Sequence, residues 1–132
     1  MTTSKTILVV EDDEGLRLVV KKALEAQGYS VIHAEDSVGS NASVRLRGGL
    51  VDLLLADINL PGLTGGEYAD YLTTINPNLK VLYMSGAASD GLVRLHVRQK
   101  KAGFLQKPFT LEELVTAVRR TLEGNPSGPD AV

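Results

Sequence analysis

The stretch Asp52-Leu53-Leu54-Leu55-Ala56-Asp57-Ile58-Asn59-Leu60-Pro61-Gly62 decides the fold of this chain. An apolar run of strand length, too short for a helix, leads to Asp57 and stops at Pro61-Gly62. Such a run is typical of a strand buried on both faces, as in a parallel sheet. Asp57 then lies at the carboxyl end of a central strand, where open α/β sheets bind their ligands. The stretch alone also allows an ordinary turn aspartate, so the interpretation depends on the rest of the chain.

The composition is that of a small soluble globular domain. The chain has 132 residues, of which 43% are hydrophobic, and no segment approaches the length of a membrane span. The absence of cysteine excludes disulfides but identifies no compartment, and the N-terminus has no apolar signal-peptide core. By default we expect a cytoplasmic protein without membrane insertion. A net charge of -2 argues against direct nucleic-acid binding. We expect one domain over residues 1–123, a disordered or linker-like tail over 124–132, and a monomer or weak dimer.

Strand and helix patterns alternate along the sequence. Besides the opening stretch, strands are expected over residues 6–10, 29–34, 79–84 and 103–106. A helix is expected after each strand. The second, third and fourth helices are expected over residues 37–48, 67–75 and 90–101, the first ends before Gly28, and the last follows Thr110. The first helix is expected to bury Leu16, Val19, Val20, Ala23, Leu24 and Gln27. The last is capped by Thr110, with Glu112 and Glu113 in its first turn and Arg119 and Arg120 in its last. Five strands alternating with five helices predict a parallel sheet with helices on both faces.

Four strand ends carry polar side chains of distinct kinds, which a parallel sheet brings to one edge. They are Glu11, Asp12 and Asp13 after the first strand, Asp57 after the third, Ser85 after the fourth and Lys107 after the fifth. Crowded carboxylates repel one another, and a divalent cation such as Mg²⁺ relieves that repulsion. A carboxylate can also attack phosphorus to give an aspartyl phosphate, whose extra oxygens a lysine and a hydroxyl can hold. Each group alone is common in turns and at helix N-termini, but the joint placement points to this chemistry.

The chain resembles the receiver domain of bacterial two-component response regulators, over about residues 5–122. The resemblance is carried by Ile7-Leu8-Val9-Val10-Glu11-Asp12-Asp13, the opening stretch, Met84-Ser85-Gly86 and Phe104-Leu105-Gln106-Lys107-Pro108-Phe109. It implies a flavodoxin-like (βα)5 fold with a five-stranded parallel sheet in the order 2-1-3-4-5. It also implies a phosphorelay role, in which a histidine kinase or histidine phosphotransfer protein donates the phosphoryl group. Such a domain is not an enzyme beyond its own phosphorylation and dephosphorylation.

The resemblance implies a role for each matching residue. Asp57 is expected to be the phosphoacceptor, and Glu11 and Asp12 the acidic pair that holds Mg²⁺ or Mn²⁺ together with Asp57, with Asp13 a further possible ligand. The register of this pair rests on Arg17, which many receivers have five residues after the second acid. Asn59 is expected to offer its backbone carbonyl to the metal, Ser85 the switch hydroxyl, Lys107 the phosphate-binding ammonium and Phe104 the switch aromatic.

The amino-acid sequences of the fourth and fifth strands are most similar to those of the C-terminal receivers of hybrid sensor histidine kinases. The chain is therefore expected to be either such a domain or a free-standing relay receiver. Two segments depart from the common pattern. Residues 37–43 are polar and glycine-rich, and residues 94–101 are unusually basic. Both departures bear on the identity of the partner.

Two other functions remain as alternatives. A haloacid-dehalogenase-like phosphatase also combines Asp, Mg²⁺, Ser or Thr and Lys, but its nucleophile follows the first strand in an Asp-x-Asp pattern. A flavodoxin-like electron carrier needs a phosphate-binding loop after the first strand, where this chain has four acids in residues 11–14 that would repel phosphate.

Overall fold

The computed structural model describes residues 4–36, 39, 51–58, 64–86 and 102–124. Five strands and three helices lie in these ranges. The strands are β1 (Thr6–Val10), β2 (Ser30–Ala34), β3 (Leu53–Asp57), β4 (Lys80–Ser85) and β5 (Gly103–Gln106). The helices are α1 (Glu14–Ala26), α3 (Gly65–Ile75) and α5 (Leu111–Leu122). The helices expected over 37–48 and 90–101, and the expected tail, lie outside the described residues apart from Gly39 and Gly124.

All five strands form one parallel sheet in the order β2-β1-β3-β4-β5. This confirms the predicted topology. β1 and β3 are the central strands, and nearly all of their residues are buried because helices cover both faces of the sheet. The continuous apolar runs of the sequence therefore correspond to strands that have no solvent-facing side.

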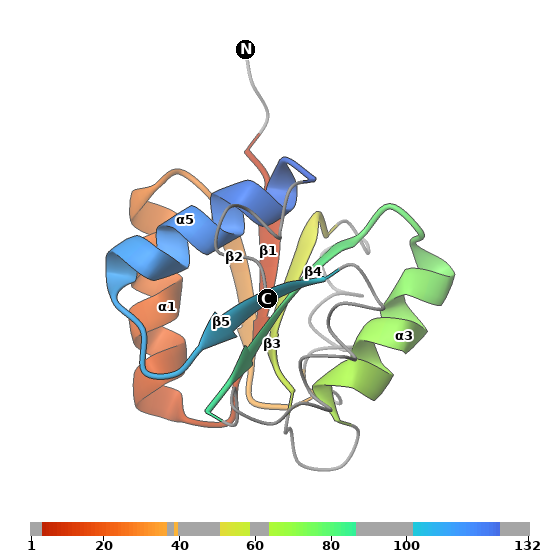
Figure 1. Cartoon of the computed structure of the whole chain (residues 1–132), viewed down its shortest axis with the longest axis horizontal. Helices are drawn as coiled ribbons and strands as arrows, with labels where there is room; N and C mark the ends of the chain where they lie inside the picture. Colours follow the sequence, from red (N-terminus) through yellow and green to blue (C-terminus); the bar gives the residue numbers. More distant parts are fainter. Residues whose placement is uncertain (1–3, 37–38, 40–50, 59–63, 87–101, 125–132) are drawn as a thin grey trace.

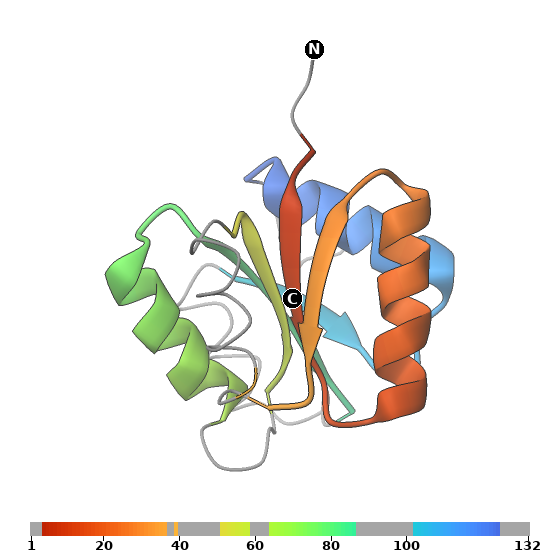
Figure 2. The same ribbon diagram turned by 180° about the vertical axis from the view of Figure 1, so that it is seen from behind.

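Alternate residues along each strand pack against different helices. Leu8 and Val10 of β1 belong to a cluster that includes Tyr68 and Leu72 of α3. Ile7 and Val9 of β1 belong to a second cluster, which packs against α1 and α5. The buried members of this second cluster are Ile7, Val9, Val20, Leu24, Val31, Leu53, Leu55, Leu82, Met84, Leu105, Leu114 and Val118. Figure 1 and Figure 2 show α1 and α5 on one face of the sheet and α3 on the other. The sheet edge that carries the strand ends is therefore held rigidly between two packed layers.

The helices begin at side-chain caps that the sequence encodes. Asp13 caps α1, and its Oδ1 accepts from Leu16 N at 3.0 Å. Thr64 and Thr110 cap α3 and α5, each in a capping box with the glutamate three residues later. The cap predicted at Thr110 is confirmed, whereas α3 begins at Gly65, two residues before the predicted start, because Thr64 and Glu67 already satisfy its first amide groups.

Two further details differ from the sequence-based expectation. β4 runs from Lys80 to Ser85, so Ser85 is its last residue and does not follow it. Val19 and Gln27 are expected on the buried face of α1, but both are exposed. Val19 is 50% exposed because the helix turns Val20 and Leu24 toward the sheet, and Gln27 is the C-cap residue after the helix. Within the described ranges, no helix is long and apolar enough to cross a membrane.

Candidate functional site at the carboxyl edge of the sheet

The register of the sheet brings the predicted site residues to one edge. Val10 of β1 is paired with Ala56 of β3, so the next residues along the two strands, Glu11 and Asp57, lie side by side. On the other side of β3, Asp57 is paired with Met84, which directly precedes Ser85. Lys107 follows β5, and its backbone N donates to Ser85 O at 3.0 Å. Residues that are up to 96 positions apart in sequence thus meet because the strands are parallel.

Lys107 connects two of the three carboxylates at this edge. Its Nζ donates to Asp57 Oδ2 at 2.7 Å and to Glu11 Oε1 at 2.5 Å. Burial disfavours the ammonium, but the hydrogen bonds to Asp57 and Glu11 outweigh burial, so the pKa of Lys107 is raised above 10.5. Lys107 is therefore a fixed positive charge whose position is set by both acids.

Glu11 is fully buried, which is unusual for a carboxylate. Its Oε2 accepts from Asp13 N at 3.0 Å, while Oε1 accepts from Lys107. Burial raises the pKa of Glu11 above 4.5, although the Asp13 amide and Lys107 act against this. The raised pKa of Glu11 favours its neutral form, whereas the raised pKa of Lys107 favours its charged form, so the two shifts disagree about the charged pair. The short contact between them supports the charged arrangement, since the ammonium donates to two carboxylates at once.

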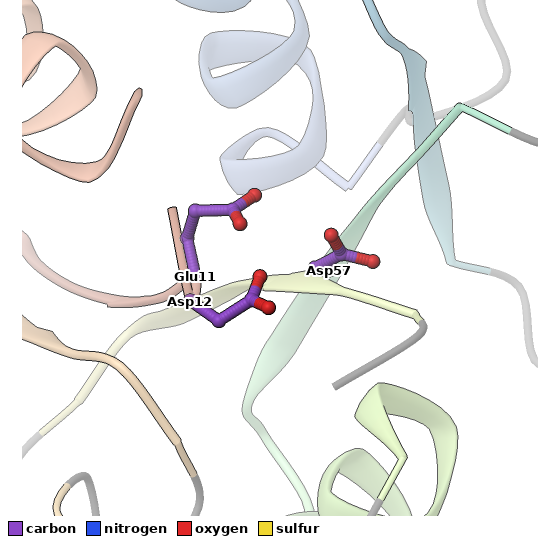
Figure 3. A group of neighbouring side chains, drawn as sticks. All are labelled: Glu11, Asp12 and Asp57. Atoms are coloured by element: carbon purple, nitrogen blue, oxygen red, sulfur yellow. The ribbon is translucent and has the colours of Figure 1, made fainter. Parts of the chain in front are cut away.

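Asp12 completes an acidic group of three. Carboxylate oxygens of Glu11, Asp12 and Asp57 all lie within 4.8 Å of one another, with Asp12 exposed and the other two buried. Figure 3 shows Glu11 and Asp12 extending from the end of β1 on the side that faces Asp57. Three carboxylates and one ammonium leave an excess of negative charge, and clustered carboxylate oxygens are the ligands that Mg²⁺ prefers. The residues present therefore fit a hard divalent cation.

Asp13 differs from Asp12 in its surroundings. Its side chain caps α1, and the acidic group of three does not include it. This capping is the role that an acid just before a helix commonly has. Asn59, whose carbonyl was expected to bind the metal, lies outside the described residues.

The two expected switch residues lie on neighbouring strands. Ser85 is fully buried at the end of β4, next to the strand that carries Asp57. Phe104 is partly buried in β5, is paired with Tyr83 of β4, and packs against the cluster under α3. Ser85 therefore lies at the same edge of the sheet as Lys107, whereas Phe104 lies inside β5.

The sequence did not reveal one contact made by Arg17. Its Nη1 donates to the backbone oxygen of Glu11 at 2.8 Å. Arg17 served only to set the register of the acidic pair. A side-chain donor to a backbone carbonyl before the helix has no signature in composition or periodicity, so it is seen only in the structure.

Comparison with known proteins agrees with the fold. The family model for the response regulator receiver domain matches residues 7–119. The response regulator receiver protein CpdR of Brucella abortus is 38% identical over 118 residues, which is 89% of this chain and 97% of CpdR. The sensor kinase CckA of the same organism is 34% identical over 123 residues, which is 93% of this chain but only 13% of the kinase. The similarity noted in the sequence to receivers of sensor kinases is thus confirmed.

Solved structures show the same architecture. The receiver domain of the hybrid histidine kinase CckA superimposes with a TM-score of 0.73 at 27% identity, covering 89% of this chain and 98% of that one. The chemotaxis protein CheY4 of Vibrio cholerae superimposes with a TM-score of 0.80 at 24% identity over 90% of this chain and 99% of CheY4, which is a likeness of fold. Neither the phosphatase nor the electron-carrier alternative is favoured by these matches. With its sheet order, its acidic edge and this family match, the chain belongs to the response regulator receiver domains of two-component systems.

Proposed function

We propose that this domain accepts a phosphoryl group on Asp57 from a phosphohistidine. The observation that carries the proposal is the position of Asp57 Oδ2, which lies 2.7 Å from Lys107 Nζ and beside the carboxylates of Glu11 and Asp12. A nucleophilic carboxylate next to a fixed cation and a potential metal site has the parts that phosphoryl transfer needs.

The transfer balances without further reactants. A carboxylate oxygen of Asp57 forms a bond to phosphorus as the bond from phosphorus to the histidine nitrogen breaks. The imidazole leaves with the electron pair of that bond and, having carried a proton on its other nitrogen, departs neutral. Lys107 is placed to compensate charge on the transferred oxygens, because its ammonium already lies against Asp57.

A divalent cation, Mg²⁺ or Mn²⁺, would be held by Glu11, Asp12 and Asp57, with the Asn59 carbonyl as a further ligand. When bound, it would offset negative charge between the phosphoryl oxygens and the carboxylates. The chain's own contribution is to hold three carboxylates within 4.8 Å of one another against their repulsion. Asp13 is the weaker candidate as a ligand, since its side chain caps α1.

The donor would be a histidine kinase or a histidine phosphotransfer protein. Similarity to CckA, of which this chain spans 13%, and to CpdR, of which it spans 97%, supports both a receiver within a hybrid kinase and a free-standing one. In either arrangement the domain itself catalyses only its own phosphorylation and dephosphorylation.

Phosphorylation would also change the surface formed by the helix expected over residues 90–101, by β5 and by α5. A phosphoryl group on Asp57 can bind the Ser85 hydroxyl and Lys107 in one arrangement of these groups, and such differential binding shifts a pre-existing equilibrium. Phe104 lies in β5 and is paired with Tyr83 of β4, two residues before Ser85. Its inward rotation would report the shift, as the resemblance to the family implies.

The test is incubation with acetyl phosphate or phosphoramidate and Mg²⁺, followed by intact mass measurement. The wild type should gain one phosphoryl group, and Asp57→Asn should gain none. Equal phosphorylation of both proteins would show that another residue is the acceptor.

A further inference from the structure

Arg17 joins the first turns of α1 to the segment that carries the acids. Its Nη1 donates to Glu11 O at 2.8 Å, and its backbone N donates to Asp13 O at 2.9 Å. The first contact is made by a charged side chain, which makes it stronger than a neutral hydrogen bond. It reaches back six residues across the turn from β1 to α1.

The carbonyl that Arg17 contacts belongs to the peptide unit between Glu11 and Asp12. Because a peptide unit is planar, fixing its oxygen fixes the direction in which the chain enters Asp12. The nitrogen of Glu11 is fixed on the other side, since it donates to Ala34 O of β2 at 3.1 Å. Asp12 itself is exposed, so the directions of its backbone bonds have a large influence on where its carboxylate lies.

The rest of the Arg17 side chain is also confined. Arg17 is partly buried, and its Nε is a buried donor without a hydrogen-bond partner among the described residues. His33 Nδ1, on β2, is likewise buried and without a partner in that part of the chain. Burial, then Lys21 and Arg17, lower the pKa of His33 below 6.5, so at neutral pH the ring is uncharged and can offer a nitrogen as acceptor. A buried donor and a buried acceptor thus lie on the two elements, α1 and β2, that flank the acidic segment.

We propose that Arg17 is a positioning residue for the metal site: by holding the Glu11 carbonyl, it keeps the carboxylates of Glu11 and Asp12 directed toward Asp57. This inference rests on the proposed function for the identity of the site. It assigns Arg17 no contact with metal or phosphate. Partners outside the ligand shell that orient ligands commonly change metal affinity by about 10- to 100-fold.

Charge and positioning make opposite predictions, which gives a sharp test. Removing a cation near an acidic site should by itself tighten Mg²⁺ binding slightly, whereas loosening the acidic segment should weaken it. Lys21 is the matched control, because it is a cation one turn further along α1 that pairs with Glu25 at 3.3 Å. Arg17→Met and Lys21→Met remove the same charge from the same helix.

Mg²⁺ affinity is measured by calorimetry and by amide chemical shifts of residues 11–13 in the full chain. We expect Arg17→Met to bind Mg²⁺ about tenfold more weakly than wild type, and Lys21→Met to bind as tightly or slightly more tightly. Arg17→Lys, which can still donate to the carbonyl, should recover part of the loss and serves as a second variant if Arg17→Met folds poorly.

Two outcomes overturn the proposal in distinguishable ways. Arg17→Met that binds Mg²⁺ as tightly as Lys21→Met would show that Arg17 does not position the site, whatever Asp57 accepts. A wild-type protein without measurable Mg²⁺ binding would overturn both this inference and the proposed metal site. Failure of phosphorylation on Asp57 with normal Mg²⁺ binding would overturn only the proposed function.

Discussion

Lys107 and Asp57 are 50 residues apart in sequence, and their Nζ and Oδ2 atoms lie 2.7 Å apart. The same ammonium also contacts Glu11, which is fully buried. One cation therefore connects the ends of β1, β3 and β5 through two carboxylates. This ion pair network gives the site both its stability and its chemical role, and the predictions below separate the two.

Lys107→Met should destabilise the protein by about 2 kcal/mol, because it leaves the buried Glu11 carboxylate without a charged donor. The loss should become smaller as the pH falls, because burial raises the pKa of Glu11 and protonation removes the charge that Lys107 compensates. Urea unfolding at pH 7 and pH 5 measures both effects. Lys80→Met removes an exposed lysine from β4 and serves as control. Equal small effects in both variants would show that the Lys107 contacts contribute little to folding.

Asp12→Ala should have opposite effects on stability and on metal binding. It relieves repulsion within the acidic group, so the metal-free protein should be unchanged or more stable by about 0.5 kcal/mol or less. Mg²⁺ binding and phosphorylation should be lost, because an accessible ligand is gone. Asp13→Ala, by contrast, should destabilise α1 by about 1 kcal/mol through loss of its cap and leave Mg²⁺ binding nearly intact. Phosphorylation of the wild type in excess EDTA would contradict a role for the metal.

Tyr83 predicts an alkaline limit to stability. Burial, with a smaller effect from Asp70, raises the pKa of this phenol from 10.0 to about 12. Because the pKa of Tyr83 is raised in the folded state, the contribution of the neutral phenol to the free energy of unfolding is complete below pH 10. This contribution is lost as the pH rises from 10 to about 12. Two pKa units correspond to about 3 kcal/mol. Urea unfolding from pH 9 to 12 should show a smaller decline for Tyr83→Phe than for wild type. Tyr71→Phe, at a 44% exposed position, should decline as the wild type does.

A phosphorylation switch predicts chemical shift changes beyond the acidic edge. Adding beryllofluoride and Mg²⁺, which mimic the aspartyl phosphate, should shift Ser85, Phe104 and residues 86–106 in addition to the segments around Asp57. A hydrogen bond to a charged group contributes about 1.5–3 kcal/mol, enough to change a population ratio roughly tenfold or more. If the shifts stay confined to the segments around Asp57, the domain relays phosphate without changing its surface.

The resemblance to the receiver family implied the sheet order, which the structure confirms. The meeting of Asp57 with Lys107 could be predicted from the residues, because the ends of parallel strands share an edge. The prediction from the sequence was wrong about Val19, since an apolar residue at the border of a helical stripe is buried or exposed according to the helix's rotation on the sheet. The capping box of Thr64 and Glu67 is a sequence signal for the start of α3, two residues before the expected start. The contact of Arg17 with the Glu11 carbonyl could not be predicted, because it depends on the path of the turn and not on any residue pattern.

The central claim, that Asp57 carries the phosphoryl group, is tested most directly by locating the modified residue. The protein is phosphorylated with phosphoramidate and Mg²⁺, then treated with borohydride, which reduces an acyl phosphate to homoserine, and its peptides are sequenced by mass spectrometry. We predict homoserine at position 57 in the wild type and its absence in Asp57→Asn. Homoserine at position 12 or 13, or a phosphorylated protein without homoserine, would contradict the account.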